Sequence, residues 1–346
     1  MPNTTIEQNL TSIISSQQDI RAAIIEKGVA VPSNTPFAQY GNKIRDIGSG
    51  APSGEWDDLI SIWNTNKNAN SRMLLVLSDI LPTFVFDQSQ LGNAGCTYRT
   101  SDGATYNANA THTWNTALDI PRDGRYIRWI IVDSPNPTVN CNNAVSGNNY
   151  AIFVYMANNS NVINFQFGYL QSEPFTIANF LLDALLTDGT VTQTWNNYAL
   201  YALYLRNIDF RGLSVIPLAG ITGGRMKYLN LDGITSIAQN GLRGMLFMHT
   251  LKITSTLTSI NTTGSAEYTF QMLRSLQRIE IDNGWVFPSN ANFSSTAFFS
   301  DSAAAELGTR LGVSPTARTL TFGAANLNRW SAQTKALFTS KNITLA

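Results

Sequence analysis

The chain is poor in charged side chains, and the few that it has balance. Lysine plus arginine and aspartate plus glutamate number 23 each among 346 residues, so 13% of the chain is charged and the net charge is zero. Nucleic-acid binding is not expected, because the phosphate backbone attracts proteins with a basic excess. Asparagine, threonine, serine and glutamine carry the polarity instead. A surface without charge repulsion suits a protein held in an assembly.

Cysteine and histidine are also scarce. Cys96 and Cys141 allow one disulfide at most, and a four-ligand zinc site would need both of them together with His112 and His249. We expect two buried free thiols, and neither a metal nor a cofactor. The sequence starts without the regions of a signal peptide, and no apolar run approaches the roughly 18 residues of a membrane span. We therefore expect a soluble chain without export or membrane insertion.

The motifs of the common enzyme classes are missing. The sequence has no phosphate-binding loop, no nucleophile elbow, no zinc-protease motif and no dinucleotide fingerprint, so we expect no catalytic residues. Glycoside hydrolysis needs only two carboxylates at a suitable distance, and no motif reveals such a pair. Asp119, Asp123 and Asp133 lie close in sequence to Trp114 and Trp129. They are the candidates for this enzymatic alternative.

The first fifty residues predict a helix with an apolar seam. Thr4 and Glu7 have the spacing of a capping box, and Gly28 ends the pattern. Steps of four and three alternate along the seam residues Ile6, Leu10, Ile13, Gln17, Ile20 and Ile24. Isoleucine and leucine at both core positions favour three or four strands over two, so we expect a homo-oligomer, with a trimer favoured. In the alternative, a second short helix over residues 37–47 covers the seam as a helical hairpin.

This segment resembles a known module. The run Asp19–Gly28, then Val31-Pro32, then Phe37–Ile47 is similar to a short helical module that is common in tailed-phage virion proteins. In that module a helix ends in Lys-Gly and a short helix follows. The resemblance covers under a sixth of the chain. It implies that these helices attach the chain to other virion proteins.

A change of period marks the middle of the chain. Gly48–Gly54 reads as a flexible linker, and short runs rich in aromatic and β-branched residues follow it. Asp-Gly pairs at 102–103 and 123–124 predict tight hairpins between some of these runs. We expect a β-rich, sandwich-like domain over residues 55–195.

Part of this domain also resembles segments of phage structural proteins. The resemblance rests on Thr100–Tyr106, His112-Thr113-Trp114 and Arg128-Trp129. His112 and Trp114 lie two residues apart, so in a strand they share one face. That face is either a sugar-binding platform or half-buried packing, and packing is the more common role.

The last 150 residues contain a broken repeat. An apolar-polar-apolar triplet recurs at spacings of 21, 22 and 28 residues in Ile208–Phe210, Leu229–Leu231, Leu251–Ile253 and Ile279–Ile281. This spacing is the signature of leucine-rich repeats, whose short strands form a parallel sheet. Alternation turns the middle residue of each triplet outward. The candidate binding face is therefore the row Asp209, Asn230, Lys252 and Glu280.

The repeat resembles two groups of proteins. Leu257–Ile260 and Gln271–Ile281 are similar to the repeats of bacterial surface-antigen-type leucine-rich-repeat proteins. The end, Leu307–Leu345, resembles the C-terminal cap of leucine-rich-repeat proteins that phages and prophages encode, in which a strand, a helix and a final strand follow one another. Lys341-Asn342 stands where that cap has Lys-Gly, and asparagine tolerates the same left-handed backbone. The stretch between Ile281 and Leu320 departs from a regular repeat.

These observations predict an α+β multidomain protein. Residues 1–47 form a helical hairpin or short coiled coil for attachment and oligomerisation, 48–54 a linker, 55–195 the β-rich domain and 196–346 an irregular leucine-rich-repeat domain with a cap. The resemblances imply a non-enzymatic phage virion protein, a tail fibre, tip or adaptor that attaches to a glycan or protein of the host surface. An internal baseplate, collar or capsid-fibre component is the alternative, and a glycan-cleaving enzyme is the less favoured one.

Overall fold

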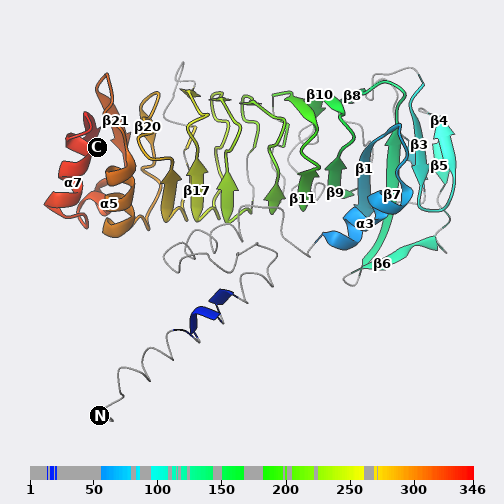
Figure 1. The fold of residues 1–346 in the computed structure, drawn as a ribbon, viewed down its shortest axis with the longest axis horizontal. Coiled ribbons are helices and arrows are strands. Elements are labelled where there is room, and N and C mark those ends of the chain that lie inside the picture. Colours follow the sequence, from blue (N-terminus) through cyan, green and yellow to red (C-terminus); the bar gives the residue numbers. More distant parts are fainter. Residues whose placement is uncertain are drawn as a thin grey trace, which may run out of the picture. The chain divides into compact units, whose positions relative to one another are not determined.

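The computed structural model shows a mixed α/β protein that is rich in strands. It describes residues 14, 16–18, 20, 21, 56–78, 83–85, 95–107, 111–113, 115, 118–122, 125–142, 150–166, 182–197, 199–200, 205–221, 225–260, 269–270 and 272–346. The chain divides into two compact units, residues 1–62 and 63–346. The sheets formed by the described strands are open, and none of them closes into a barrel (Figure 1).

The largest sheet begins with antiparallel strands. Its order is β13-β11-β9-β1-β7-β3-β4, and β6 pairs with β7. The bounds are β1 (Ser71–Ser78), β3 (Thr97–Thr100), β4 (Thr105–Asn107), β6 (Ile120–Arg122), β7 (Arg125–Asp133), β9 (Tyr150–Met156), β11 (Ala184–Thr187) and β13 (Asn207–Ile208). The apolar runs 73–77 and 130–132 are fully buried and lie in β1 and β7, which pair with each other. Continuous apolar runs of this kind are typical of strands that are covered on both faces.

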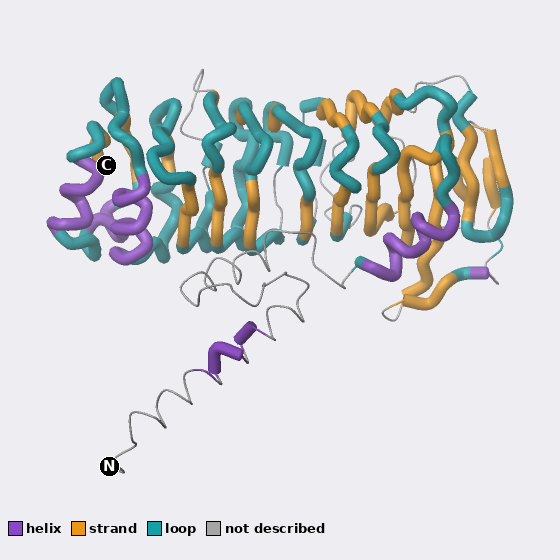
Figure 2. Tube along the Cα trace, in the orientation of Figure 1, coloured by secondary structure: helices purple, strands orange, loops and turns teal. Residues whose placement is uncertain are grey.

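Most strands from β8 onward pair in parallel, and they form two rows, each of which is made of two sheets. The first strand row holds β9, β11, β13, β15 (Tyr228–Asn230), β17 (Thr250–Ile253) and β19 (Arg278–Ile281). The second strand row holds β8 (Thr138–Asn142), β10 (Asn161–Gln166), β12 (Thr192–Trp195), β14 (Val215–Ile216), β16 (Ser236–Ile237) and β18 (Ser259–Ile260). One strand of each row makes a coil, and strands alternate with loops along unit 2 (Figure 2). Short β2 (Thr83–Val85) and β5 (Thr111–Thr113) pair with each other.

A sharp turn follows several strands of the first row. Its residue with positive φ is Asn158 (63°) in one coil and then Gly189 (82°), Gly212 (80°) and Gly233 (81°) in the next three. At Gly212 an added Cβ would lie 1.7 Å from the carbonyl oxygen of Val191 in the neighbouring coil. Glycine is required there both for the left-handed backbone and for the close approach of two coils.

One apolar core runs through unit 2, from Met73 in β1 to Ile343 in the last strand. Both strand rows contribute inward residues, for example Val154 and Leu251 from the first row and Val162 and Ile237 from the second. Towards the C-terminus aromatic rings fill the core. Ring centroids are 4.9–5.1 Å apart along the series Phe270, Phe293, Phe322 and Trp330.

Helices replace regular coils at the C-terminal end. After β19 come β20 (Ala291–Asn292), α5 (Asp301–Arg310), β21 (Arg318–Thr321), α6 (Ala324–Leu327), α7 (Ala332–Thr339) and β22 (Ile343–Leu345). The hydroxyls of Ser300 and Ser331 cap α5 and α7, as their positions before each helix favour. The expected strand, helix and final strand are present, since β21 pairs in parallel with β22. Asn342 has a φ of 61°, the left-handed conformation predicted for it.

The middle region contains the predicted strands, but their pairing continues past the expected domain boundary. β11 pairs with β13, and Gln193 forms a parallel bridge with Leu213, so both rows cross residues 195–196. The boundaries of the expected domains stay predictions. The linker 48–54 lies outside the described residues.

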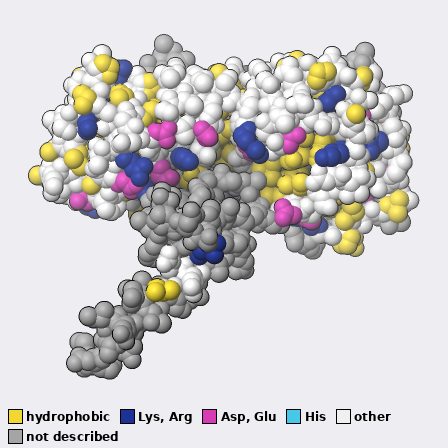
Figure 3. Space-filling model, viewed as in Figure 1, with side chains coloured by type: hydrophobic (Ala, Val, Ile, Leu, Met, Phe, Trp, Pro, Cys, Tyr) yellow, Lys and Arg dark blue, Asp and Glu magenta, His cyan; other side chains and the backbone are white. Residues whose placement is uncertain are grey.

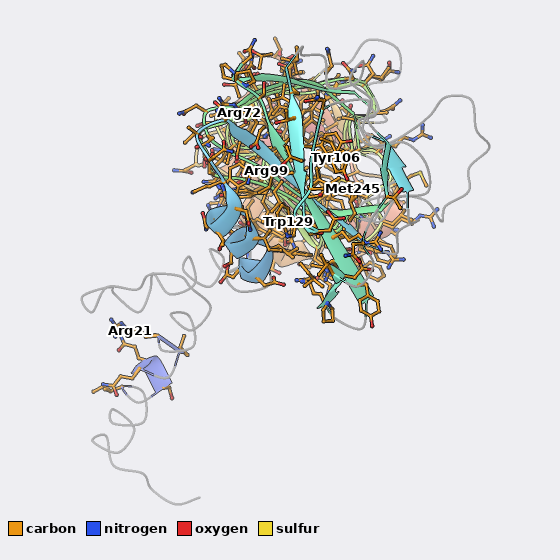
Figure 4. The ribbon with its side chains drawn as sticks, turned by 90° about the vertical axis from the view of Figure 1, so that its right-hand side faces the viewer. Arg21, Arg72, Arg99, Tyr106, Trp129 and Met245 are labelled. Carbon is orange, nitrogen blue, oxygen red and sulfur yellow. The ribbon has the colours of Figure 1, made fainter. Side chains whose placement is uncertain are left out.

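Little of the N-terminal segment is described. Residues 14, 16–18, 20 and 21 are helical, and helix α3 (Asp57–Asn66) follows later in the chain. Figure 4 labels Arg21 on this turn of helix. Of the predicted seam, Gln17 and Ile20 are half-buried. Ile6, Leu10, Ile13 and Ile24 lie outside the described residues.

In the described part of the chain, no helix combines the length and the apolar character that crossing a bilayer requires.

Candidate binding face

The outer side of the first strand row carries the predicted polar residues. Asn230 pairs with Lys252, and Lys252 pairs with Glu280, so the three stand in register on β15, β17 and β19. Neighbouring strands are about 4.8 Å apart, which sets the spacing of this row. Leu229, Leu251 and Ile279 flank the row and are buried. Asp209 follows β13 in the preceding coil, where its backbone N–H donates to the carbonyl of Leu185 over 2.9 Å.

Asp209 is held by an ion pair within its own turn. Its Oδ2 accepts from two nitrogens of Arg211, at 2.8 Å and 2.5 Å. Arg211 also donates to the carbonyl of Thr187 in the coil before, over 2.7 Å. The hydrogen bond to Asp209 raises the pKa of the Arg211 guanidinium above its ordinary value, against the opposing effect of burial. Asp209 therefore joins two coils, and its charge is balanced.

Glu280 belongs to a second ion-pair network. Arg278 lies 3.4 Å from Glu280 and 2.6 Å from Glu306 of α5. Arg310 adds a contact of 3.3 Å to the same Glu306 carboxylate. The network ties the last strand of the row to the helix that follows it. The acidic end of the row is thus part of the C-terminal packing.

Asn230 and Lys252 have more freedom to meet a partner. The Oδ1 atom of Asn230 accepts from the backbone N–H of Asp232 over 3.1 Å, which leaves the amide NH2 outward as a donor. Within the described part of the chain, Lys252 has neither an ion pair nor a side-chain hydrogen bond. Acidic and basic side chains lie close together across the face seen in Figure 3. The row thus has the Lys252 ammonium group and the Asn230 amide between two carboxylates, those of Asp209 and Glu280. Each of these carboxylates forms an ion pair with an arginine.

The row also extends backward to residues that sequence reasoning missed. Tyr155 pairs with Leu186 on β9 and β11, at the outward position of the first two coils. Leu186 is buried, and the ring of Tyr155 meets that of Trp63 edge to face at 5.7 Å. The outer side is therefore apolar and covered in these coils, and polar from Asp209 onward. The recurring turn Thr187-Asp188-Gly189 and Phe210-Arg211-Gly212 is the signal that marks these earlier coils.

The carboxylates considered for glycoside hydrolysis are bound to arginines. Asp119 accepts from both Nε and Nη2 of Arg128. Asp133 is buried and accepts 2.6 Å bonds from Arg99 Nε and from the hydroxyl of Ser71 (Arg99 is labelled in Figure 4). Arg128 and Asp133 are five residues apart on β7, which puts them on opposite faces of the strand. Asp123 lies outside the described residues.

The scarce cysteine and histidine residues form no shared site among the described residues. Cys96 is a buried free thiol, as expected, whereas the side chain of Cys141 lies outside the described part of the chain. No described group of three or more metal-ligating side chains is placed to hold an ion. The backbone of His112 in β5 pairs with that of Phe84 in β2. Trp114 lies outside the described residues, so the predicted aromatic platform stays a prediction.

Comparison with known proteins does not identify a family for this chain. Comparisons of this chain with protein families, with curated protein sequences and with solved structures found no match.

Proposed function

We propose that this chain is a non-enzymatic structural protein of a tailed-phage virion, a tail fibre, tip or adaptor component that takes part in host attachment. Its N-terminal helices join copies of the chain, with a trimer favoured, and attach them to other virion proteins. A β-rich, sandwich-like middle region connects them to irregular leucine-rich repeats with a C-terminal cap. The resemblance of both ends of the chain to phage modules supports this layout.

The observation that carries the proposal is the row Asn230, Lys252 and Glu280. Adjacent parallel strands hold these residues in register on one outer face. Strands hold side chains more rigidly than loops do, and stacked repeats create extended binding surfaces. Attachment to a partner through this face explains why polar residues replace the apolar ones of the earlier coils.

The test replaces Lys252 and Glu280 together by alanine in particles that carry the full chain. We expect intact particles whose adsorption to host cells falls. Lys67→Ala, at an exposed lysine that directly follows α3, is the control that removes a positive charge elsewhere. Normal adsorption and normal assembly in the double variant would show that the row is not the contact face.

The same experiment separates the second candidate, an internal baseplate, collar or capsid-fibre component. Glu280 already takes part in contacts between β19 and α5 through Arg278, so this end of the row is suited to protein packing as well. For an internal component, the double variant reduces the yield of complete particles. Those particles that do form then adsorb normally.

A further inference from the structure

The second strand row differs from the first in its charge. Six successive segments that contain its strands and their turns include no Asp, Glu, Lys or Arg, although 13% of the chain is charged. The segments are 137–142, 157–166, 190–197, 213–221, 233–242 and 254–260. From β13 onward the first row carries Asp209, Lys252 and Glu280 on its outer face, with the neutral Asn230 on β15 between Asp209 and Lys252. The second row is therefore uncharged throughout these segments, whereas the first row has charged side chains on its outer face at Asp209, Lys252 and Glu280.

Small hydroxyl and amide side chains line the outer side of the second row. Thr138 and Thr192 both pair with Asn161, and Ser236 pairs with Val215 and Ser259. The alternating residues, such as Val162, Ile216 and Ile237, are buried in the core. The exposed hydroxyl residues in these strands are Thr192, Thr194 and Ser259, and those directly before a strand are Ser214, Thr235 and Thr258.

Two of these hydroxyls are oriented by the neighbouring coil. Thr235 Oγ1 donates to the carbonyl of Ser214 over 3.0 Å, and Thr258 Oγ1 donates to the carbonyl of Thr235 over 3.4 Å. A hydroxyl that donates inward keeps its lone pairs for an outside donor. The face thus presents a hydrogen-bonding group at each coil, about 4.8 Å from the next.

The chemistry of this face favours a neutral, hydroxyl-rich partner. A charged ligand would lose hydration here without meeting an opposite charge. Protein interfaces depend on aromatic and arginine anchors. In the described residues of these segments, Val215 is the only large hydrophobic side chain that is exposed. Sugar hydroxyls match such a face, because each one both donates and accepts hydrogen bonds.

We infer that the second strand row binds a neutral polysaccharide, which lies across the strands with successive sugars over successive coils. The length of one sugar unit in an extended polysaccharide is close to the strand spacing. Each coil adds a few weak direct or water-mediated hydrogen bonds, and affinity comes from their repetition. This inference rests on the proposed attachment role, since it names the class of surface ligand, but it uses a different face from Lys252 and Glu280.

The experiment introduces either sign of charge into the face of the full chain. Thr194 and Ser259 lie in separate coils, and each is changed to Asp and to Lys. Retardation is measured in gels that contain dextran, mannan or galactan, with heparin as the anionic comparison. Thr309→Asp and Thr309→Lys, at an exposed position of α5, are matched controls.

We expect retardation by at least one neutral polymer, little dependence on salt, and about tenfold weaker binding with either charge at Thr194 or Ser259. The introduced Asp and Lys side chains should weaken binding equally, because either charged group must lose hydration when the polysaccharide binds. No retardation by any neutral polymer, or opposite effects of Asp and Lys, would overturn the inference. So would a concentration-dependent mass that these variants abolish, because the occupant would then be a second copy.

Failure of this inference is distinct from failure of the contact row. If Lys252 and Glu280 variants impair adsorption while no neutral polymer retards the chain, only the polysaccharide site is wrong. If Thr194 and Ser259 variants lose polymer binding while the double alanine variant adsorbs and assembles normally, the contact row is wrong and this inference stands.

Discussion

At Gly212 the backbones of two neighbouring coils meet, and a side chain there has no space. Gly212→Ala combines a left-handed backbone, which costs about 1–2 kcal/mol for an L-residue, with displacement of the Val191 carbonyl, which adds about 1–3 kcal/mol by analogy with overpacking. We expect the free energy of unfolding to fall by roughly the sum. Denaturant unfolding of the full chain measures it.

Gly233 is the matched control in the following coil. Its φ of 81° is almost the same, and an added Cβ meets nothing within 4 Å. Gly233→Ala should therefore lose only the backbone contribution of about 1–2 kcal/mol. Equal losses at the two positions would mean that the close approach at Gly212 relaxes without cost.

Tyr98 is a second residue with a testable consequence. Burial in β3, followed by the nearby Tyr106, raises the pKa of its phenol to about 12. A raised pKa stabilises the fold below the unfolded value of about 10, and this contribution is lost as the pH rises from there to about 12. We expect a late-titrating phenol in the absorbance of the folded chain. Tyr98→Phe should remove it, and a phenol that persists in this variant would assign it to another tyrosine.

At the scale of elements, Asp301 links the starts of α5 and α7. Its carboxylate accepts a 2.8 Å bond from the backbone N–H of Ser331. This bond is the main cause of the lowered pKa of Asp301. A lowered pKa stabilises the fold above the unfolded value, and the contribution is lost as the pH falls through the folded value.

We therefore expect Asp301→Asn to lower thermal stability at neutral pH. The difference from the natural chain should vanish in acid, where both side chains are uncharged. Asp232→Asn, at an exposed turn, should show no such convergence. A difference that persists in acid would mean that the packing of the side chain, rather than its charge, joins the two helices.

Elements with both faces buried were predictable, whereas their partners were not. The run 73–77 is apolar throughout and the run 127–132 is apolar except for Arg128, and both have the length of a central strand. The pairing of β9 with β11 escaped prediction, because Leu185 follows Val154 by 31 residues and β11 is buried on both faces, so the sequence shows no alternation. The regular spacing of the later triplets did predict the register of Asn230, Lys252 and Glu280.

The surroundings of that row were beyond the reach of sequence. Whether Asp209 bonds Arg211, or Glu280 meets Arg278, depends on side-chain directions that spacing does not determine. The uncharged second row could have been predicted from the sequence. It becomes visible when charged residues are counted coil by coil instead of over the whole chain.

For the whole molecule, the decisive measurement is its mass in solution by light scattering. We expect the full chain to be a trimer and a chain that begins at Gly54 to be a monomer, because the seam with Gln17 and Ile20 lies before the linker. If both the full chain and the shortened chain are monomers, the second short helix covers the seam within a hairpin. If both are oligomers, the contacts between copies lie in the β-rich or leucine-rich part.

The two ends of the coil stack differ from its middle, and this limits how such a protein changes length. Antiparallel strands β1 and β7 precede the parallel strands, and α5 and α7 follow them. Duplication of one repeat of 21 or 22 residues between these ends would keep both ends intact and lengthen each surface by about 4.8 Å. Such a protein can therefore gain or lose one repeat at a time during evolution while the spacing between neighbouring repeats stays the same.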